Sequence, residues 1–112
     1  MGPAGFADCR ARRLWEVELS LFVVVWHYVD DTELVDRIRP LHREFLMKLV
    51  EAGTVRQAGP WVDGSGGLLV FDVAGQDELD GWIEQDPFTV HGAIAHRQSW
   101  AWRPLVGPLS EG

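Results

Sequence analysis

One stretch of the chain, Leu19 to Val29, constrains the fold most. It reads LSLFVVVWHYV, which is almost continuously apolar and rich in β-branched and aromatic residues. Such a run is typical of a strand that is buried on both faces of a sheet. Its apolar part, Leu21 to Trp26, is far shorter than the roughly 20 residues that a membrane-spanning helix needs. The sequence therefore predicts a central strand and no membrane span there.

A helical segment follows this strand. Asp30, Asp31 and Thr32 offer helix-capping side chains, and apolar residues with helical spacing continue to Val50. Pro40 complicates the segment, because proline is tolerated in the first turn of a helix but not in its interior. We therefore expect a short turn over residues 32–37 and the main helix from about residue 39 to residue 52.

The rest of the chain predicts two further strands, a second helix and a last strand. The Gly-rich residues 63–67 predict a hairpin loop, and Asp86-Pro87 ends the second helix because a residue before proline avoids the α region. The expected ranges are Thr54–Trp61, Leu68–Val73, Gln76–Gln85 and Ala93–Arg103. The order βαββαβ predicts an α+β, ferredoxin-like fold: a four-stranded antiparallel sheet with two helices on one face.

The other face of such a sheet has no helix to cover it. Since the strand at Leu19–Val29 is apolar in both directions, the open face would be a large apolar patch. We therefore expect a homodimer packed sheet to sheet, which is a dimeric α/β barrel.

Length and charge limit the remaining choices. The chain has 112 residues and a formal net charge of −7, which predicts no nucleic-acid partner and no anionic membrane surface. The length fits one domain, placed at residues 18–106 between a flexible N-terminal extension (1–17) and a C-terminal tail (107–112). The single cysteine, Cys9, excludes an intrachain disulfide and favours a reducing cytoplasm.

Five short motifs fall at the joints of the predicted unit. They are Arg39-Pro40-Leu41-His42, Leu49-Val50-Glu51-Ala52-Gly53, Ala58-Gly59-Pro60, Gly66-Gly67-Leu68 and Asp86-Pro87-Phe88. In their order and spacing the chain resembles the YCII-related family of small dimeric α/β-barrel proteins, over nearly everything after residue 20. The resemblance implies a ferredoxin-like fold, a dimer and a pocket between helices and sheet.

The resemblance also implies a reaction type. In this sequence the histidine and aspartate of the implied acid/base pair are His42 and Asp86. The family is similar to muconolactone isomerases and to a dehydrochlorinase of a chlorinated hydroxyquinol, which implies elimination or isomerisation without a cofactor.

The residues themselves leave alternatives for this pair. His42 lies at the edge of the helical apolar stripe and projects toward the sheet, where a neutral imidazole can take or give a proton. The alternative is a core histidine bonded to a backbone carbonyl. Asp86 ends a helix, where a carboxylate is unfavourable to the helix dipole, so it is a candidate partner that orients His42. The alternative is a turn-forming aspartate that accepts from nearby N–H groups.

The other histidines, His27, His91 and His96, show no recognised ligand spacing with His42, so we assign no metal site.

Six tryptophans are numerous for this length, and the core and a dimer interface account for most of them. A minority near strand ends or on the helix-facing surface of the sheet are candidates to line a pocket for a flat ring. The full set of candidate substrate-binding residues is Trp26, Tyr28, Phe45, Gly59, Pro60, Trp61, Phe88 and Trp100.

These observations favour a cofactor-independent lyase or isomerase that acts on a cyclic or aromatic metabolite, in secondary metabolism or aromatic degradation. His42 would move a proton next to a carbonyl or on a phenolic ring, and Asp86 would position it. One alternative is a cofactor-free monooxygenase of aromatic polyketides, which the tryptophan content favours. The other is a non-catalytic ligand-binding dimer in which both residues are structural.

Overall fold

The structure is a computed structural model that describes residues 20–110. Residues 21–102 form one compact unit, and residues 103–110 are part of a second unit. In the second unit the backbone N–H of Ser110 donates to the carbonyl of Gly107 at 3.0 Å. The expected N-terminal extension (1–17) and Cys9 lie outside the described residues. None of the helices within residues 20–110 is long and apolar enough to cross a membrane.

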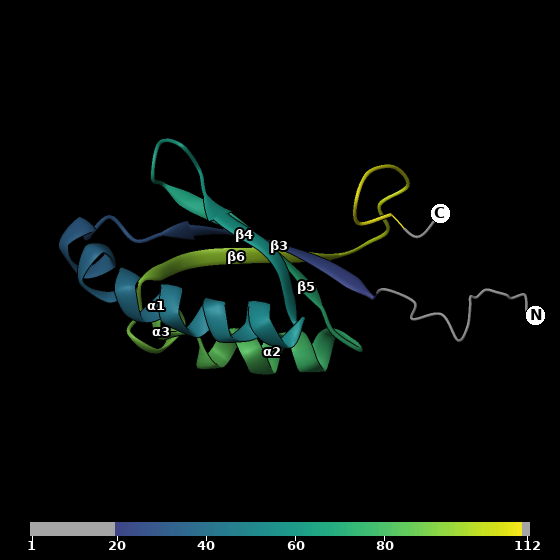
Figure 1. The fold of residues 1–112 in the computed structure, drawn as a ribbon. Coiled ribbons are helices and arrows are strands. Elements are labelled where there is room, and N and C mark those ends of the chain that lie inside the picture. The colour runs from purple at the N-terminus through teal and green to yellow at the C-terminus, as the bar shows by residue number, and fades with distance from the viewer. Residues whose placement is uncertain (1–19, 111–112) are drawn as a thin grey trace, which may run out of the picture. The chain divides into compact units, whose positions relative to one another are not determined.

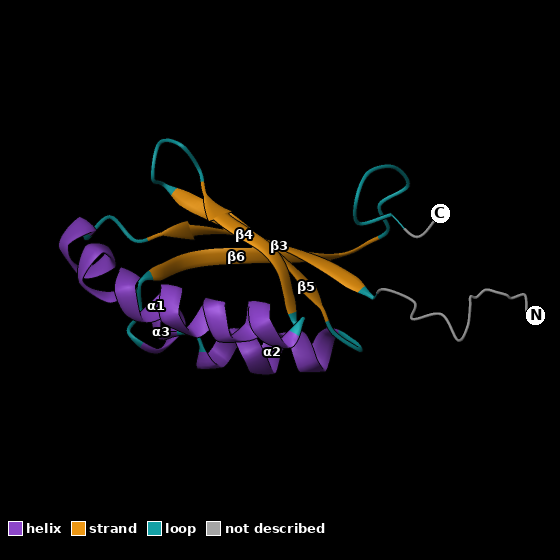
Figure 2. Cartoon of the chain, in the orientation of Figure 1, coloured by secondary structure: helices purple, strands orange, loops and turns teal. Residues whose placement is uncertain are grey.

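The unit over residues 21–102 has the predicted ferredoxin-like architecture. Its four strands form an antiparallel sheet in the order β4-β5-β3-β6, and the helices lie on one face of it (Figure 1, Figure 2). The elements are β3 (Leu21–Tyr28), α1 (Thr32–Ala52), β4 (Val55–Pro60), β5 (Gly66–Asp72), α2 (Gln76–Gln85), α3 (Pro87–Val90) and β6 (Ile94–Trp102). The predicted strands differ from these by one or two residues at their ends, and α2 has its predicted bounds.

The expected break near Pro40 is wrong, because α1 is continuous from Thr32 to Ala52 with the proline inside it. The side chain of Asp31 accepts from the Leu34 N–H at 3.1 Å, and Gly53 closes the helix at φ +83°. Pro40 cannot donate to the Asp36 carbonyl, but it lies on the exposed side of the helix, where water can bond that carbonyl. The first turns of α1 lie at an angle to the rest, as proline-containing helices often do (Figure 1).

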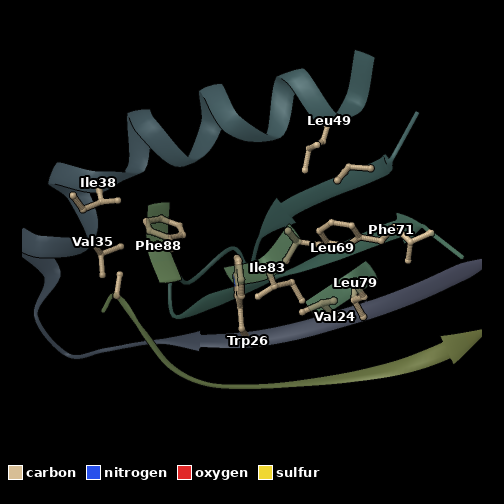
Figure 3. Packing of buried hydrophobic residues seen from close by; sticks show 13 residues of the cluster. Val24, Trp26, Val35, Ile38, Leu49, Leu69, Phe71, Leu79, Ile83 and Phe88 are labelled. Atoms are coloured by element: carbon tan, nitrogen blue, oxygen red, sulfur yellow. The ribbon is translucent and has the colours of Figure 1, made fainter. Parts of the chain in front are cut away.

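The core lies between the sheet and the helices. On β3, Val24 and Trp26 are fully buried on the helix side, whereas His27 is exposed on the other side. The prediction that this strand is buried on both faces therefore holds only in part, since no helix within residues 20–110 covers the second face. The core also includes residues of β5, α2 and α3 (Figure 3), among them Leu69, Phe71, Leu79, Ile83 and Phe88.

The register of β6 decides which tryptophans reach the helix side. Val24 pairs with Ser99, and Ser99 accepts a hydrogen bond from Gln76 of α2 at 3.2 Å. Neighbouring residues of a strand point to opposite faces, so Trp100 and Trp102 lie on the face away from the helices. Their exposed fractions are 51% and 42%.

Candidate active site

His42 and Asp86 meet in the folded chain. His42 lies in the middle of α1, and Asp86 is the single residue between α2 and α3. Nδ1 of His42 lies 2.9 Å from both carboxylate oxygens of Asp86. An ionised carboxylate only accepts hydrogen bonds, so the proton between them belongs to Nδ1. The fold thus joins two residues that are 44 positions apart in the sequence.

Asp86 is a buried carboxylate, with 1% of its surface exposed. Besides His42 it accepts from the backbone N–H of Phe88 at 2.9 Å, which makes it the N-cap of α3. Asp86 thus accepts from a nearby backbone N–H, as the alternative of a turn-forming aspartate proposed, because a second helix begins at Pro87 directly after α2 ends. Burying a carboxylate is unfavourable unless its oxygens are bonded, and these two bonds orient it.

Aromatic rings hold the imidazole of His42 in place. The Phe88 ring stacks on it at 4.1 Å between centroids, with 21° between the planes. Trp26 lies 5.8 Å away on the sheet side, and Tyr28 contacts Phe88 at 5.1 Å. Within residues 20–110, the other ring nitrogen, Nε2, makes no hydrogen bond. The imidazole is thus fixed at one nitrogen and available at the other.

His42 lines a cavity of about 230 Å³ between α1 and the sheet. From α1 the lining side chains follow one helical face at spacings of three and four residues: Arg39, His42, Arg43, Leu46, Met47 and Val50. The sheet contributes Trp26 and Tyr28 from β3, Ala58, Gly59 and Pro60 from β4, and Gly67, Leu68 and Leu69 from β5. The lining is mostly apolar, with His42, Tyr28 and the two arginines as its polar groups.

Tyr28 adds a hydroxyl to the cavity. Burial raises the pKa of Tyr28, against the opposing effect of the Arg39 guanidinium. That guanidinium lies 5.7 Å from the centre of the Tyr28 ring. The phenol is therefore kept in its neutral form, which can donate a hydrogen bond.

The structure brings part of the predicted binding set together. The residues that line the cavity together with His42 are Trp26, Tyr28, Gly59 and Pro60. Phe88 is not among the lining residues, and its ring stacks on the imidazole of His42.

Three predicted binding residues lie elsewhere. Phe45 points toward α2, with its ring 6.5 Å from that of Trp82. Trp61 follows β4, where its N–H donates to the Gly66 carbonyl, and it is not among the lining residues. Trp100 is on the opposite face of the sheet because of the β6 register.

Arg39, Arg43, Met47 and Val50 were missed as candidates. The signal that could have found them is their spacing from His42 on one helical face, which the predicted helix over residues 39–52 already contained. For metals, no group of three or more His, Cys, Asp or Glu side chains able to hold an ion occurs within residues 20–110.

Comparison with known proteins gives a family and solved structures of similar fold. The model of the YCII-related domain matches residues 21–103. No curated protein matches the chain. A similar solved structure is the 5-chloro-2-hydroxyhydroquinone dehydrochlorinase of Burkholderia phenoliruptrix AC1100 in complex with 2,5-dihydroxybenzoquinone. It is 24% identical, with a TM-score of 0.64 over 74% of this chain and 93% of that chain, a likeness of fold.

Proposed function

The chain belongs to the YCII-related family, and from this premise we propose that it is a cofactor-independent lyase or isomerase that moves a proton on a cyclic or aromatic small molecule. In this proposal His42 is the general acid/base and Asp86 is its positioning residue. The observation that carries the proposal is the buried Asp86 carboxylate, which bonds His42 through both oxygens at 2.9 Å beside a cavity.

The proposed step begins with a neutral imidazole. Its Nδ1–H donates to Asp86, so Nε2 carries the lone pair that takes a proton, either from a ring carbon next to a carbonyl group or from a phenolic hydroxyl on the ring. The electron pair of the broken C–H or O–H bond moves into the conjugated system of the ring, and Asp86 stabilises the imidazolium that forms. In an isomerisation Nε2–H then returns the proton to another carbon. In an elimination the electron pair expels a leaving group, and Nε2–H gives its proton to solvent.

The cavity supports a flat ring as the substrate. Its volume is about 230 Å³, and its walls include Trp26, Leu46 and Leu69. Pockets of this composition hold apolar rings, and a few polar groups fix the orientation of the ring. The dehydrochlorinase of similar fold is a lyase by its reaction, and its structure contains a six-membered quinone, which supports the lyase type and the ring size.

The monooxygenase alternative rested on a group of tryptophans around the pocket. Of Trp26, Trp61 and Trp100, only Trp26 lines the cavity. No specific observation favours that reaction over proton transfer, so we do not carry it further. The non-catalytic alternative remains as an outcome of the experiment below.

A kinetic comparison tests the proposal. The full chain is screened with cyclic enones, unsaturated lactones and chlorinated hydroxyquinols, and then compared with His42→Gln and Asp86→Asn. Loss of a positioned general base lowers kcat by about 10²–10⁴-fold, so His42→Gln is expected to lose that much. The control, His91→Gln, changes an exposed histidine outside the cavity lining and is expected to keep full turnover.

Two results would contradict the proposal. One is a His42→Gln variant that turns over a wild-type substrate at the wild-type rate. The other is a native protein that binds panel compounds in the cavity and converts none of them, which would support the ligand-binding dimer.

A further inference from the structure

We infer that the cavity selects ring compounds that carry a negative charge, such as a phenolate, an enolate or a carboxylate, and that Arg39 and Arg43 are the residues that select them. The inference names the substrate class of the proposed enzyme and rests on the same cavity. It concerns equilibrium binding, so it can fail or hold independently of proton transfer by His42.

The placement of the two arginines follows from helix geometry. Arg39, His42 and Arg43 are spaced by three and four residues on α1, so their side chains share one face and lie within about 6 Å of rise along the axis. The next lining positions on this face are Leu46, Met47 and Val50. The α1 wall therefore has a cationic end beside His42 and an apolar end beyond it.

The charges at the cationic end are not cancelled from within the cavity. Of residues 20–110, no Asp or Glu lines the cavity, although the chain as a whole has a formal net charge of −7. Arg39 contacts Asp36 at 3.4 Å, but that aspartate side chain is 74% exposed, so the ion pair is weak. Among the described residues Arg43 has no ion pair. Asp86 is already bonded by His42 and Phe88.

Arg39 and Arg43 line the cavity and also line a second depression along α1, so they lie where the two adjoin. The carboxylates of this second depression are those of Asp36, Glu44 and Glu51, and none of the three lines the cavity itself. A ring that enters with its apolar part toward Leu46 and Val50 would leave an anionic oxygen at the arginines. Guanidinium groups bind such oxygens through two N–H groups, and these charge-assisted bonds are about twice as strong as neutral ones.

The same contact would assist the reaction. When Nε2 of His42 takes a proton from a ring carbon, negative charge develops on the conjugated oxygen of the substrate. Fixed N–H donors aimed at that oxygen stabilise the charge as it forms. Arg39 and Arg43 would thus act as binding residues toward the substrate anion, and the neutral Tyr28 hydroxyl offers a further donor.

A pair of probes of the same shape tests the inference without any turnover. 2-Naphthoate and 2-naphthamide have the same ring and differ in charge. Hydrogen bonds to charged groups contribute about 1.5–3 kcal/mol, which corresponds to a factor of roughly tenfold or more. By equilibrium dialysis the full chain is therefore expected to bind naphthoate at least about tenfold more tightly than naphthamide.

Substitutions then assign the preference to its residues. Arg39→Gln and Arg43→Gln are each expected to weaken naphthoate binding and leave naphthamide binding unchanged, and the double variant should bind both equally. Arg37→Gln is the matched control, because it removes the same charge from an exposed residue of α1 outside the cavity lining. Equal binding of the two probes, undetectable naphthoate binding at millimolar concentration, or an unchanged preference in the double variant would overturn the inference.

The proposed function has a separate readout. His42→Gln keeps both arginines, so it is expected to keep the preference for naphthoate while turnover is lost. A preference that persists when His42→Gln retains full turnover would support anion selection and contradict only proton transfer by His42.

Discussion

Asp86 is the residue in which structure and proposed chemistry are most closely joined. One of its carboxylate oxygens accepts from the Phe88 N–H and begins α3, and both oxygens lie 2.9 Å from Nδ1 of His42. The two alternatives for Asp86, a turn-forming aspartate and a partner of His42, therefore do not exclude each other. An asparagine could still accept a hydrogen bond from the Phe88 N–H. Asp86→Asn therefore keeps the N-cap of α3 and removes the negative charge beside His42.

Tyr28 gives a pH-dependent prediction. It is the only tyrosine in the chain, so the ultraviolet absorbance of tyrosinate reports this residue alone. Burial raises its pKa, and we expect the native protein to form tyrosinate at a higher pH than free tyrosine does. Arg39→Gln should raise that pH further, because the guanidinium opposes the effect of burial. A native titration at or below that of free tyrosine would contradict the burial of this hydroxyl.

The raised pKa of Tyr28 also makes the stability of the folded protein depend on pH. Because its pKa is raised, Tyr28 binds its proton more tightly in the folded state than in the unfolded state. This stabilises the folded protein fully at any pH below the pKa of Tyr28 in the unfolded chain. The stabilisation is lost as the pH rises through the pKa of Tyr28 in the folded protein. The free energy of unfolding should therefore fall in the alkaline range. Tyr28→Phe removes the hydroxyl that titrates, so the free energy of unfolding of this variant should fall less at alkaline pH than that of the native protein.

At the residue scale the sequence supplied the candidate pair, but neither the contact within it nor the face on which Trp100 lies. His42 and Asp86 came from motifs at the joints of the predicted unit, whereas their contact depends on how α1 packs against the α2–α3 junction. Trp100 could not be placed, because its face depends on the register of β6 against β3, which changes sides with each residue of shift.

Among the elements, α1 departs most from its prediction and contributes most to the site. Local rules start the main helix near Arg39, so that Pro40 falls in its first turn. Packing of Val35 and Ile38 before the proline and Leu49 after it instead stabilises one continuous helix. The part of α1 from Arg39 onward, which the prediction also made helical, aligns Arg39, His42 and the apolar residues after them on one face. The bounds of α2 were predicted because its residues contain no such conflict between local rules and packing.

The β4–β5 hairpin offers an element-scale prediction with a matched control. A Cβ on Gly66 would collide with the carbonyl oxygen of Trp26, whereas a Cβ on Gly59 meets no heavy atom within 4 Å. We expect Gly66→Ala to lower the free energy of unfolding by about 2 kcal/mol, as overpacking typically does. Gly59→Ala should change it by less than about 0.5 kcal/mol.

Urea unfolding of the two variants makes this comparison. Gly66 pairs with His27 at the β3–β5 ladder, and the Trp26 carbonyl beside it is backbone, so neither side can move without disturbing the sheet. Equal stability of the two variants would mean that β3 and β5 do not approach as closely as described.

For the whole molecule we propose a homodimer that packs sheet to sheet. Trp100 and Trp102 are large apolar side chains on the face opposite the helices, and they are 51% and 42% exposed. Sedimentation of the full chain at micromolar concentration is expected to give the mass of a dimer. Trp100→Glu should shift the mass toward the monomer, because a charge would be buried in an apolar interface.

Val62→Glu is the control for that shift. Val62 is an exposed apolar residue in the loop between β4 and β5, outside the sheet face that carries Trp100. It is expected to leave the mass unchanged. A native chain that sediments as a monomer would remove the proposed interface, while the ferredoxin-like fold, which is predictable from element order alone, would stand.

We propose that Asp86 accepts a hydrogen bond from Nδ1–H of His42, which keeps the proton on Nδ1 and leaves Nε2 free to exchange protons with a substrate. Nitrogen-15 NMR of the His42 ring at neutral pH tests it most directly, because ring nitrogen shifts distinguish the two tautomers of a neutral imidazole. We predict a protonated Nδ1 and an unprotonated Nε2, with the proton resonance of Nδ1–H changed in Asp86→Asn. A neutral ring that carries its proton on Nε2, with no response to Asp86→Asn, would contradict the account.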